Sequence, residues 1–172
     1  MPIIGAVVYA ADQWTKNLAL SELHPGVAVP VVGDVLSWRL VFNPGAAFSL
    51  GTGITPVFTF FQATVSIAVL VLAWRLRSSW WAVALGLVLG GAGGNLHDRL
   101  LRPPSFGYGH VVDFIALPRF PVFNVADSAI TSAAVMIMIA ALLGWEAFRT
   151  PAEVAGAASV PAGGAVAEGR DG

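Results

Sequence analysis

The chain has 172 residues, of which 56% are hydrophobic and 11% are charged. A soluble domain usually carries about 25% charged residues, so this composition excludes a disordered chain, a nucleic-acid-binding protein and an ordinary cytosolic enzyme. The formal net charge of −1 implies no bulk electrostatic partner, and the absence of cysteine excludes disulfides, thiolate metal sites and a cysteine nucleophile. The composition indicates an integral membrane protein.

Four apolar stretches approach the length of about 20 residues that a helix needs to cross a bilayer. They lie at about 2–20, 54–74, 80–96 and 126–148. The first stretch lacks the basic start of a signal peptide and contains internal charges, so we expect it to stay in the protein. Only RLRSS separates the second stretch from the third, which predicts a tight antiparallel hairpin. We expect an all-α membrane protein with four spans.

The two longer connections carry most of the polar residues, and with four spans they lie on the same side of the membrane. Residues 21–53 include VLSWRLVFN, whose partial alternation of apolar and polar residues predicts a short β-ribbon. Residues 97–125 contain Pro-Pro and several glycines, which predicts a loop with a short strand around His110–Ile115. We expect the chemistry on this side.

The last segment, 150–172, is rich in Ala, Gly and Pro and has no apolar side chain larger than valine. It buries too little surface to offset its ordering entropy, so we expect a disordered tail after a membrane domain at 1–149. Arg75, Arg77 and Arg149 lie near span ends on one side, as the positive-inside rule expects of the cytoplasm. The opposite side also carries arginines, so their number alone does not decide the orientation.

A charge in the first stretch needs an explanation, because an ionised side chain at mid-membrane costs about 2.5–3.5 kcal/mol. Asp12 and Lys16 are spaced i, i+4 and can pair on one helix face. Two interpretations stay open for this pair. It is a structural anchor of the first helix, or it supports a functional site.

Two polar motifs follow. In FNPGAAFS, Asn43 is the strong hydrogen-bonding side chain, although a plain turn also explains the Pro-Gly step. In GGAGGNLHDRL, the small residues permit close helix packing, and Asn95, Asp98 and Arg99 gather at the end of the third span. Asp98 paired with Arg102 gives a structural interpretation. Asn95 with Arg99 could instead bind a carbonyl or orient a carboxylate.

Two aspartates lie in apolar surroundings on the side where we expect chemistry. Asp113 lies in VVDFI, and Asp127 lies in FNVADSAI, three residues after Asn124. Either aspartate could be a helix cap or a loop hydrogen-bonder. However, burial raises the pKa of a carboxyl, and two carboxylates in contact share one proton, which gives an acid and a base near neutral pH. Hydrolysis of a peptide by an activated water requires such a pair.

Other chemistries fit this sequence less well. It contains no HExxH, no GxSxG and no P-loop. A metal site is conceivable, but its candidate ligands match no usual spacing: His97, Asp98, His110 and Asp113. A proton-coupled transporter could use the buried charges, but the chain has no internal repeat and no pair of broken helices.

Five motifs together carry a resemblance. They are DQWTK (12–16), NPGAAFS (43–49), GGAGGNLHDR (90–99), VVDF (111–114) and FNVAD (123–127). In this order and between four spans, they make the sequence resemble lipoprotein signal peptidase (signal peptidase II), a family of bacterial membrane aspartyl peptidases. The resemblance covers residues 1 to about 148.

The resemblance implies an aspartic endopeptidase that cleaves prolipoproteins just before a cysteine carrying diacylglyceryl, at the outer face of the bacterial cytoplasmic membrane. It implies a four-helix bundle with a small periplasmic β-cradle and a short periplasmic helix, with both termini in the cytoplasm. We expect no metal and no cofactor, membrane lipids and the prolipoprotein as partners, no nucleic acid, and a monomer.

Site residues are carried over by matching motifs. Asp113 and Asp127 match the catalytic dyad of the family. The residues that match substrate-binding or supporting positions are Asn43, Asn95, Asp98, Arg99, Asn124 and Asp12, with Lys16 as the partner of Asp12.

Overall fold

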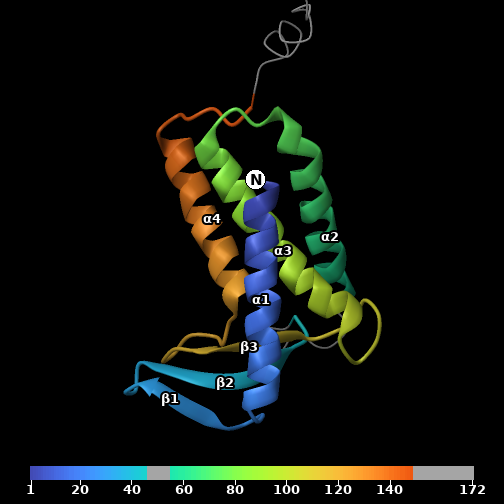
Figure 1. Ribbon diagram of the computed structural model, residues 1–172, viewed down its shortest axis with the longest axis vertical. Coiled ribbons are helices and arrows are strands. Elements are labelled where there is room, and N and C mark those ends of the chain that lie inside the picture. The colour runs from blue at the N-terminus through green and yellow to red at the C-terminus, as the bar shows by residue number, and fades with distance from the viewer. Residues whose placement is uncertain (46–54, 149–172) are drawn as a thin grey trace, which may run out of the picture.

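The computed structural model describes residues 1–45 and 55–148. Its elements in chain order are α1 (Pro2–Glu22), β1 (Ala28–Val32), β2 (Leu36–Asn43), α2 (Thr55–Leu72), the 3-10 turn η2 (Ala73–Arg75), α3 (Ser79–Leu101), β3 (Val111–Ala116) and α4 (Val125–Leu142). The four long helices pack side by side, and the sheet lies across one end of them (Figure 1). The predicted tail, Arg149 and the motif residues 46–49 lie outside the described residues.

Helix α3 is the centre of the helical layer, because it contacts α1, α2 and α4. Its small residues make two of these contacts close. A Cβ added to Gly90 would lie 2.6 Å from the backbone oxygen of Gly5 on α1. A Cβ added to Gly91 would lie 2.6 Å from the backbone oxygen of Ala126 on α4. The glycines at 90–94 therefore let three helices approach at the level where the polar residues begin.

The three strands form one antiparallel sheet in the order β1-β2-β3. Strands β1 and β2 are the ribbon predicted within 21–53, with Val29 opposite Trp38. The strand predicted near His110–Ile115 is β3, which adds to the ribbon with Val112 opposite Phe42. The first four residues of β3 are all buried, since this strand lies beneath the helices.

Helix α3 is longer than predicted, since it continues from 96 to Leu101. Asn95, Asp98 and Arg99 are therefore on successive turns of one helix and not at the start of a loop. The segment after Asn95 has no helix-breaking residue until Pro103, which disfavours helical geometry in the residue before it.

Helix α4 is shorter than predicted, because it ends at Leu142 and not near 148. Gly144 takes a φ of 67°, which suits glycine and reverses the chain. Its N–H donates to the carbonyl of Ala141 at 3.3 Å, and the N–H of Trp145 donates to Ala140 at 2.9 Å. These two bonds form a Schellman motif, which satisfies the last carbonyls and stops the helix.

The distribution of side chains is that of a membrane protein. Two of the described helices, spanning Thr55–Arg75 and Val125–Leu142, are long and apolar enough to cross a membrane. Large apolar side chains point outward, such as Phe60 at 75% exposure and Leu142 at 80%. The buried positions, by contrast, include Asp, Asn, Lys and Arg side chains.

The short helix expected on the sheet side is not found within residues 1–45 and 55–148, where η2 is the one helical element besides the four long helices. Turn η2 lies at the opposite end of α2.

Candidate active site

The site forms where the sheet meets the ends of the helices. The chain leaves β3, turns, and pairs back on it, with the N–H of Phe123 donating to Ile115 at 3.0 Å and the N–H of Ile115 donating to Phe123 at 2.8 Å. This return brings Asn124, the N-cap of α4, against β3. Asp113 on β3 and Asp127 in the first turn of α4 thereby come to the same place.

Asp127 is held by a capping box at the start of α4. The Asn124 side chain accepts from the backbone N–H of Asp127 at 2.9 Å, and the Asp127 carboxylate accepts from the backbone N–H of Asn124 at 3.2 Å. The other carboxylate oxygen accepts from Nδ2 of Asn95 at 2.9 Å. Asp127 is thus a helix cap, as one interpretation of the sequence proposed, and it also faces the buried polar residues of α3.

Asp113 is 1% exposed, and both of its oxygens accept hydrogen bonds from amides. Nδ2 of Asn124 donates at 2.7 Å and Nδ2 of Asn43 donates at 3.0 Å. The Asn43 amide is itself oriented, because its oxygen accepts from the N–H of Gly45 at 2.8 Å. Burial first, and then the charge of Asp127, raise the pKa of Asp113 to about 7 against the opposing effect of the two amides.

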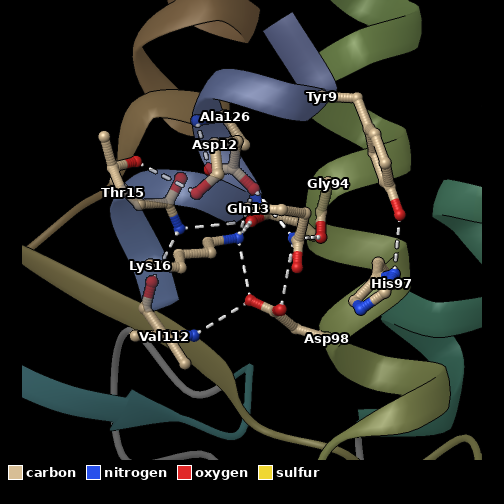
Figure 2. Close-up of polar contacts among 12 residues, drawn as sticks. Tyr9, Asp12, Gln13, Thr15, Lys16, Gly94, His97, Asp98, Val112 and Ala126 are labelled. Carbon is tan, nitrogen blue, oxygen red and sulfur yellow. Dashed lines mark hydrogen bonds and ion pairs between the residues drawn. The ribbon is translucent and has the colours of Figure 1, made fainter. Parts of the chain in front are cut away.

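A buried charge cluster supports this pair. Lys16 lies between Asp12 and Asp98, with its Nζ 2.8 Å from each carboxylate (Figure 2). Asp12 also accepts from the backbone N–H of Ala126 at 2.9 Å, and Asp98 accepts from that of Val112 at 3.1 Å. Each supporting acid therefore ties a helix to the residue that directly precedes one of the two aspartates. The predicted pair of Asp12 and Lys16 forms and is fully buried.

Asp98 also pairs with Arg102 on the next turn of α3, as the structural interpretation of this motif predicted. The other oxygen of Asp98 accepts from the backbone N–H of Val112 and so holds β3. The same contacts explain why this acid is tolerated in a buried position, where an unpaired charge would be costly.

Arg99 is only 5% exposed and points between α2 and α3. Its Nε donates to the side chain of Gln62 at 3.1 Å, and its guanidinium lies 5.5 Å from the centre of the Phe58 ring. Its NH1 is buried with no hydrogen-bond partner among the described residues. Arg99 is therefore not a charge that reaches out to solvent, and it has a donor to spare.

Two glutamines that the sequence motifs did not single out contact these residues. Gln62 orients Arg99, and Gln13 donates to the backbone oxygen of Gly94 at 3.0 Å and to Asp12 at 3.2 Å. A signal for Gln62 was present, because it is the one amide or charged side chain in the apolar stretch 54–74. Gln13 had a weaker signal as the direct neighbour of Asp12.

The alternative metal site is not assembled. His97 lies on the side of α3 facing α1, where it is hydrogen-bonded to the hydroxyl of Tyr9 at 2.8 Å (Figure 2). Within residues 1–45 and 55–148, no three His, Asp or Glu side chains come together as metal ligands would.

Comparison with known proteins gives consistent results. The family model for Signal peptidase (SPase) II matches residues 4–143. The lipoprotein signal peptidase of Rhodococcus jostii (strain RHA1) is 50% identical over 144 residues, which cover 84% of this chain and 73% of that protein. The lipoprotein signal peptidase of Mycobacterium avium (strain 104) is 46% identical over 143 residues, which cover 83% of this chain and 79% of that protein. A solved structure of a bacterial membrane enzyme matches with a TM-score of 0.72 at 31% identity, covering 81% of this chain and 85% of its own.

The apolar helices, the buried polar site and these matches define the class of the protein, which is a membrane-bound peptidase. Within that class, the chain belongs to the signal peptidase II family. The family named from the five sequence motifs is thus confirmed.

Proposed function

We propose that the enzyme removes signal peptides from prolipoproteins, cleaves before the diacylglyceryl-modified cysteine, and uses Asp113 and Asp127 to activate the water. The observation that carries this proposal is the pair itself. The carboxylates of Asp113 on β3 and Asp127 on α4 are oriented at one place by hydrogen bonds from three asparagine side chains. The ion pairs of Lys16 are made with two other carboxylates, those of Asp12 and Asp98. The relatives named lipoprotein signal peptidase support the substrate class.

The mechanism uses one aspartate as base and the other as acid. The ionised carboxylate takes a proton from a water bound between the two, and the water oxygen attacks the scissile carbonyl carbon. The protonated aspartate donates its proton to the carbonyl oxygen, which gives a tetrahedral intermediate. As the C–N bond breaks, the base aspartate passes the proton taken from water to the leaving amine, and a hydroxyl of the intermediate returns a proton to the other aspartate. The pKa of about 7 for Asp113 supports a proton being shared near neutral pH. The reaction needs no acyl-enzyme.

Arg99 binds the substrate in this proposal. Its NH1, which has no partner within residues 1–45 and 55–148, is a charged donor inside the protein, and Gln62 and Phe58 fix the direction of the guanidinium. A peptide or ester carbonyl of the substrate would satisfy this donor.

The proposed topology has α1, α2, α3 and α4 all crossing the cytoplasmic membrane of a bacterium, with the sheet and the dyad at the outer face. Arg75 and Arg77 lie at the end of the helices away from the sheet, which supports a cytoplasmic position for that end and for the termini. The protein acts as a monomer, and the lipid of the substrate enters laterally between helices. The apolar outer faces of α2 and α4 support such a route.

A cleavage assay tests the proposal. The purified enzyme is incubated with one prolipoprotein in two forms, with and without diacylglyceryl on its cysteine, and the products are identified by mass spectrometry. We expect cleavage of the modified form alone, directly before the cysteine and at the same rate with chelator present. Cleavage at another bond, equal cleavage of both forms, or loss of activity with chelator would contradict it.

A further inference from the structure

Lys16 is fully buried, and its ammonium group makes three contacts at 2.8 Å. Two are with the carboxylates of Asp12 and Asp98, and the third is with Oδ1 of Asn95. An ammonium has three N–H donors and no acceptor, so all of its donors are used. The partner atom on Asn95 must consequently be the oxygen and not the nitrogen.

This contact orients the Asn95 side chain. An isolated asparagine amide can be turned over, because its oxygen and nitrogen have nearly the same size. Here the oxygen accepts from Lys16, and also from Nδ2 of Asn124 at 3.1 Å. The nitrogen is left to donate to Asp127 at 2.9 Å. The ammonium of Lys16 is thereby connected to the carboxylate of Asp127 through the single amide of Asn95.

We propose that Lys16 is a positioning residue of the reaction, which fixes the Asn95 amide as a donor to Asp127 and so keeps this aspartate as the ionised base while Asp113 holds the proton. The inference rests on the proposed function, since it assigns the two roles within that pair.

The surroundings of the two aspartates favour this assignment of roles. Asp127 lies in the first turn of α4, where the helix dipole favours a negative charge, and it is partly exposed. It accepts from Asn95 and from the backbone N–H of Asn124. Asp113 lies on a strand and is almost fully buried, which favours its neutral form.

The charged groups around Lys16 show why its effect on Asp127 is local. Asp12 faces it from α1 and Asp98 from α3, and Arg102 lies on the far side of Asp98. The charges of these four groups cancel. Lys16 therefore acts on Asp127 mainly through the hydrogen bonds of Asn95, and less through the long-range electrostatic potential of the cluster.

The charged groups around Asp127 are Asp113 on β3 and Arg99 on α3, and both remain when Lys16 is replaced. Helix α2 contributes the uncharged Gln62 through Arg99. Lys16 also acts weakly on Asp113, whose pKa it lowers. Loss of Lys16 therefore affects the base, Asp127, through the Asn95 hydrogen bond, and the acid, Asp113, through the electrostatic effect of the lost charge.

The test compares pH–rate profiles. Lys16→Met alone leaves two buried carboxylates without their cation, so the variant is also made as Lys16→Met/Asp98→Asn, which preserves the charge of the cluster. The matched control is Asp98→Asn, which keeps the contact of Lys16 with Asn95. We expect the acid limb of kcat to move to higher pH by about one unit relative to the wild type, whose cluster has the same net charge, and also relative to the control. KM should change little, since Lys16 is fully buried and its three donors are already used within the protein.

Asn95→Leu supplies the second arm. It removes the donor to Asp127 and leaves Lys16, Asp12 and Asp98 in place, so it should move the acid limb by the same amount. Because both changes break the same connection from Lys16 to Asp127, adding Lys16→Met/Asp98→Asn to Asn95→Leu should give no further shift.

Two outcomes would overturn the inference. One is a lower melting temperature for Lys16→Met/Asp98→Asn with an unchanged acid limb, which marks a purely structural residue. The other is additive shifts for the two changes. Absence of cleavage by the wild type would instead refute the proposed function, so the two failures are distinguishable.

Discussion

The charge state of Asp113 depends strongly on its surroundings. Burial and the neighbouring Asp127 raise its pKa from 3.8 to about 7, so the folded protein binds this proton more tightly than the unfolded chain does. The stability contributed by the protonated group is full below pH 3.8 and is lost as the pH rises through about 7. We therefore expect the wild type to lose stability over this interval.

The matched control for this pH effect is Asp113→Asn, which has nearly the same shape and no titrating proton. Melting temperatures in detergent, measured across the same pH values, should fall more for the wild type than for the variant. Parallel curves for the two proteins would contradict the raised pKa of Asp113.

Arg99 matters through geometry as well as charge. Its planar fork donates to Gln62 with one nitrogen and has another nitrogen without a partner in the described part of the chain, an arrangement that a lysine cannot reproduce. Arg99→Lys should therefore lose at least about tenfold in cleavage rate, or about 1.4 kcal/mol of transition-state stabilisation, while the protein still accumulates in the membrane. A fully active Arg99→Lys enzyme would show that the second donor is not used.

The individual site residues could be identified from the sequence, because polar side chains stand out in apolar stretches. Asp113, Asp127 and their asparagines could be singled out on this ground, although their catalytic roles stay predictions. Gln62 could not be assigned a role, since an uncharged amide in a span has no partner until the packing of α2 on α3 is known.

At the scale of elements, the close approach of α3 to its neighbours sets the position of the site. A Cβ at Gly91 would lie 2.6 Å from the backbone oxygen of Ala126, the residue before Asp127. Gly91→Val should therefore displace the start of α4, cost about 1–3 kcal/mol and reduce cleavage. Thermal unfolding in detergent and the cleavage rate measure the two effects.

Gly93→Ala is the matched control in the same run of glycines. A Cβ at Gly93 meets Tyr9 at 3.9 Å, which is an ordinary contact. This variant should keep its melting temperature and activity. If Gly91→Val is as stable and active as Gly93→Ala, the close approach of α3 to α4 does not position the site.

The elements themselves were predictable to different degrees. The apolar stretches predicted where the four helices lie, because long hydrophobic runs are a strong signal. Helix α3 continues beyond its apolar stretch and helix α4 ends before the end of its own, because a missing helix breaker and the Schellman turn at Gly144 decide these two boundaries. The pairing of β2 with β3 was not predictable, since it joins segments about 70 residues apart.

At the scale of the whole molecule, the proposed topology places the two ends of α3 on opposite sides of the membrane. The chain has no cysteine, so in a single-cysteine variant any labelling by a thiol reagent occurs at the introduced residue. Ser79 begins α3 at the end away from the sheet, and Ser105 follows it on the sheet side; both are exposed. In intact cells, a membrane-impermeant thiol reagent should label Ser105→Cys, and it should label Ser79→Cys only after the membrane is permeabilised. The opposite pattern would reverse the orientation and place the dyad in the cytoplasm.

In the proposed mechanism, Asp113 and Asp127 act as one unit on one water. The most direct measurement is the cleavage rate of a diacylglyceryl-modified prolipoprotein by Asp113→Asn, Asp127→Asn and the double variant, each normalised to folded enzyme. Because the base has no function without its acid, each single change should abolish cleavage, and the double variant should be scarcely worse than either. Substantial cleavage by a single variant, or losses that add in the double variant, would contradict the aspartyl mechanism.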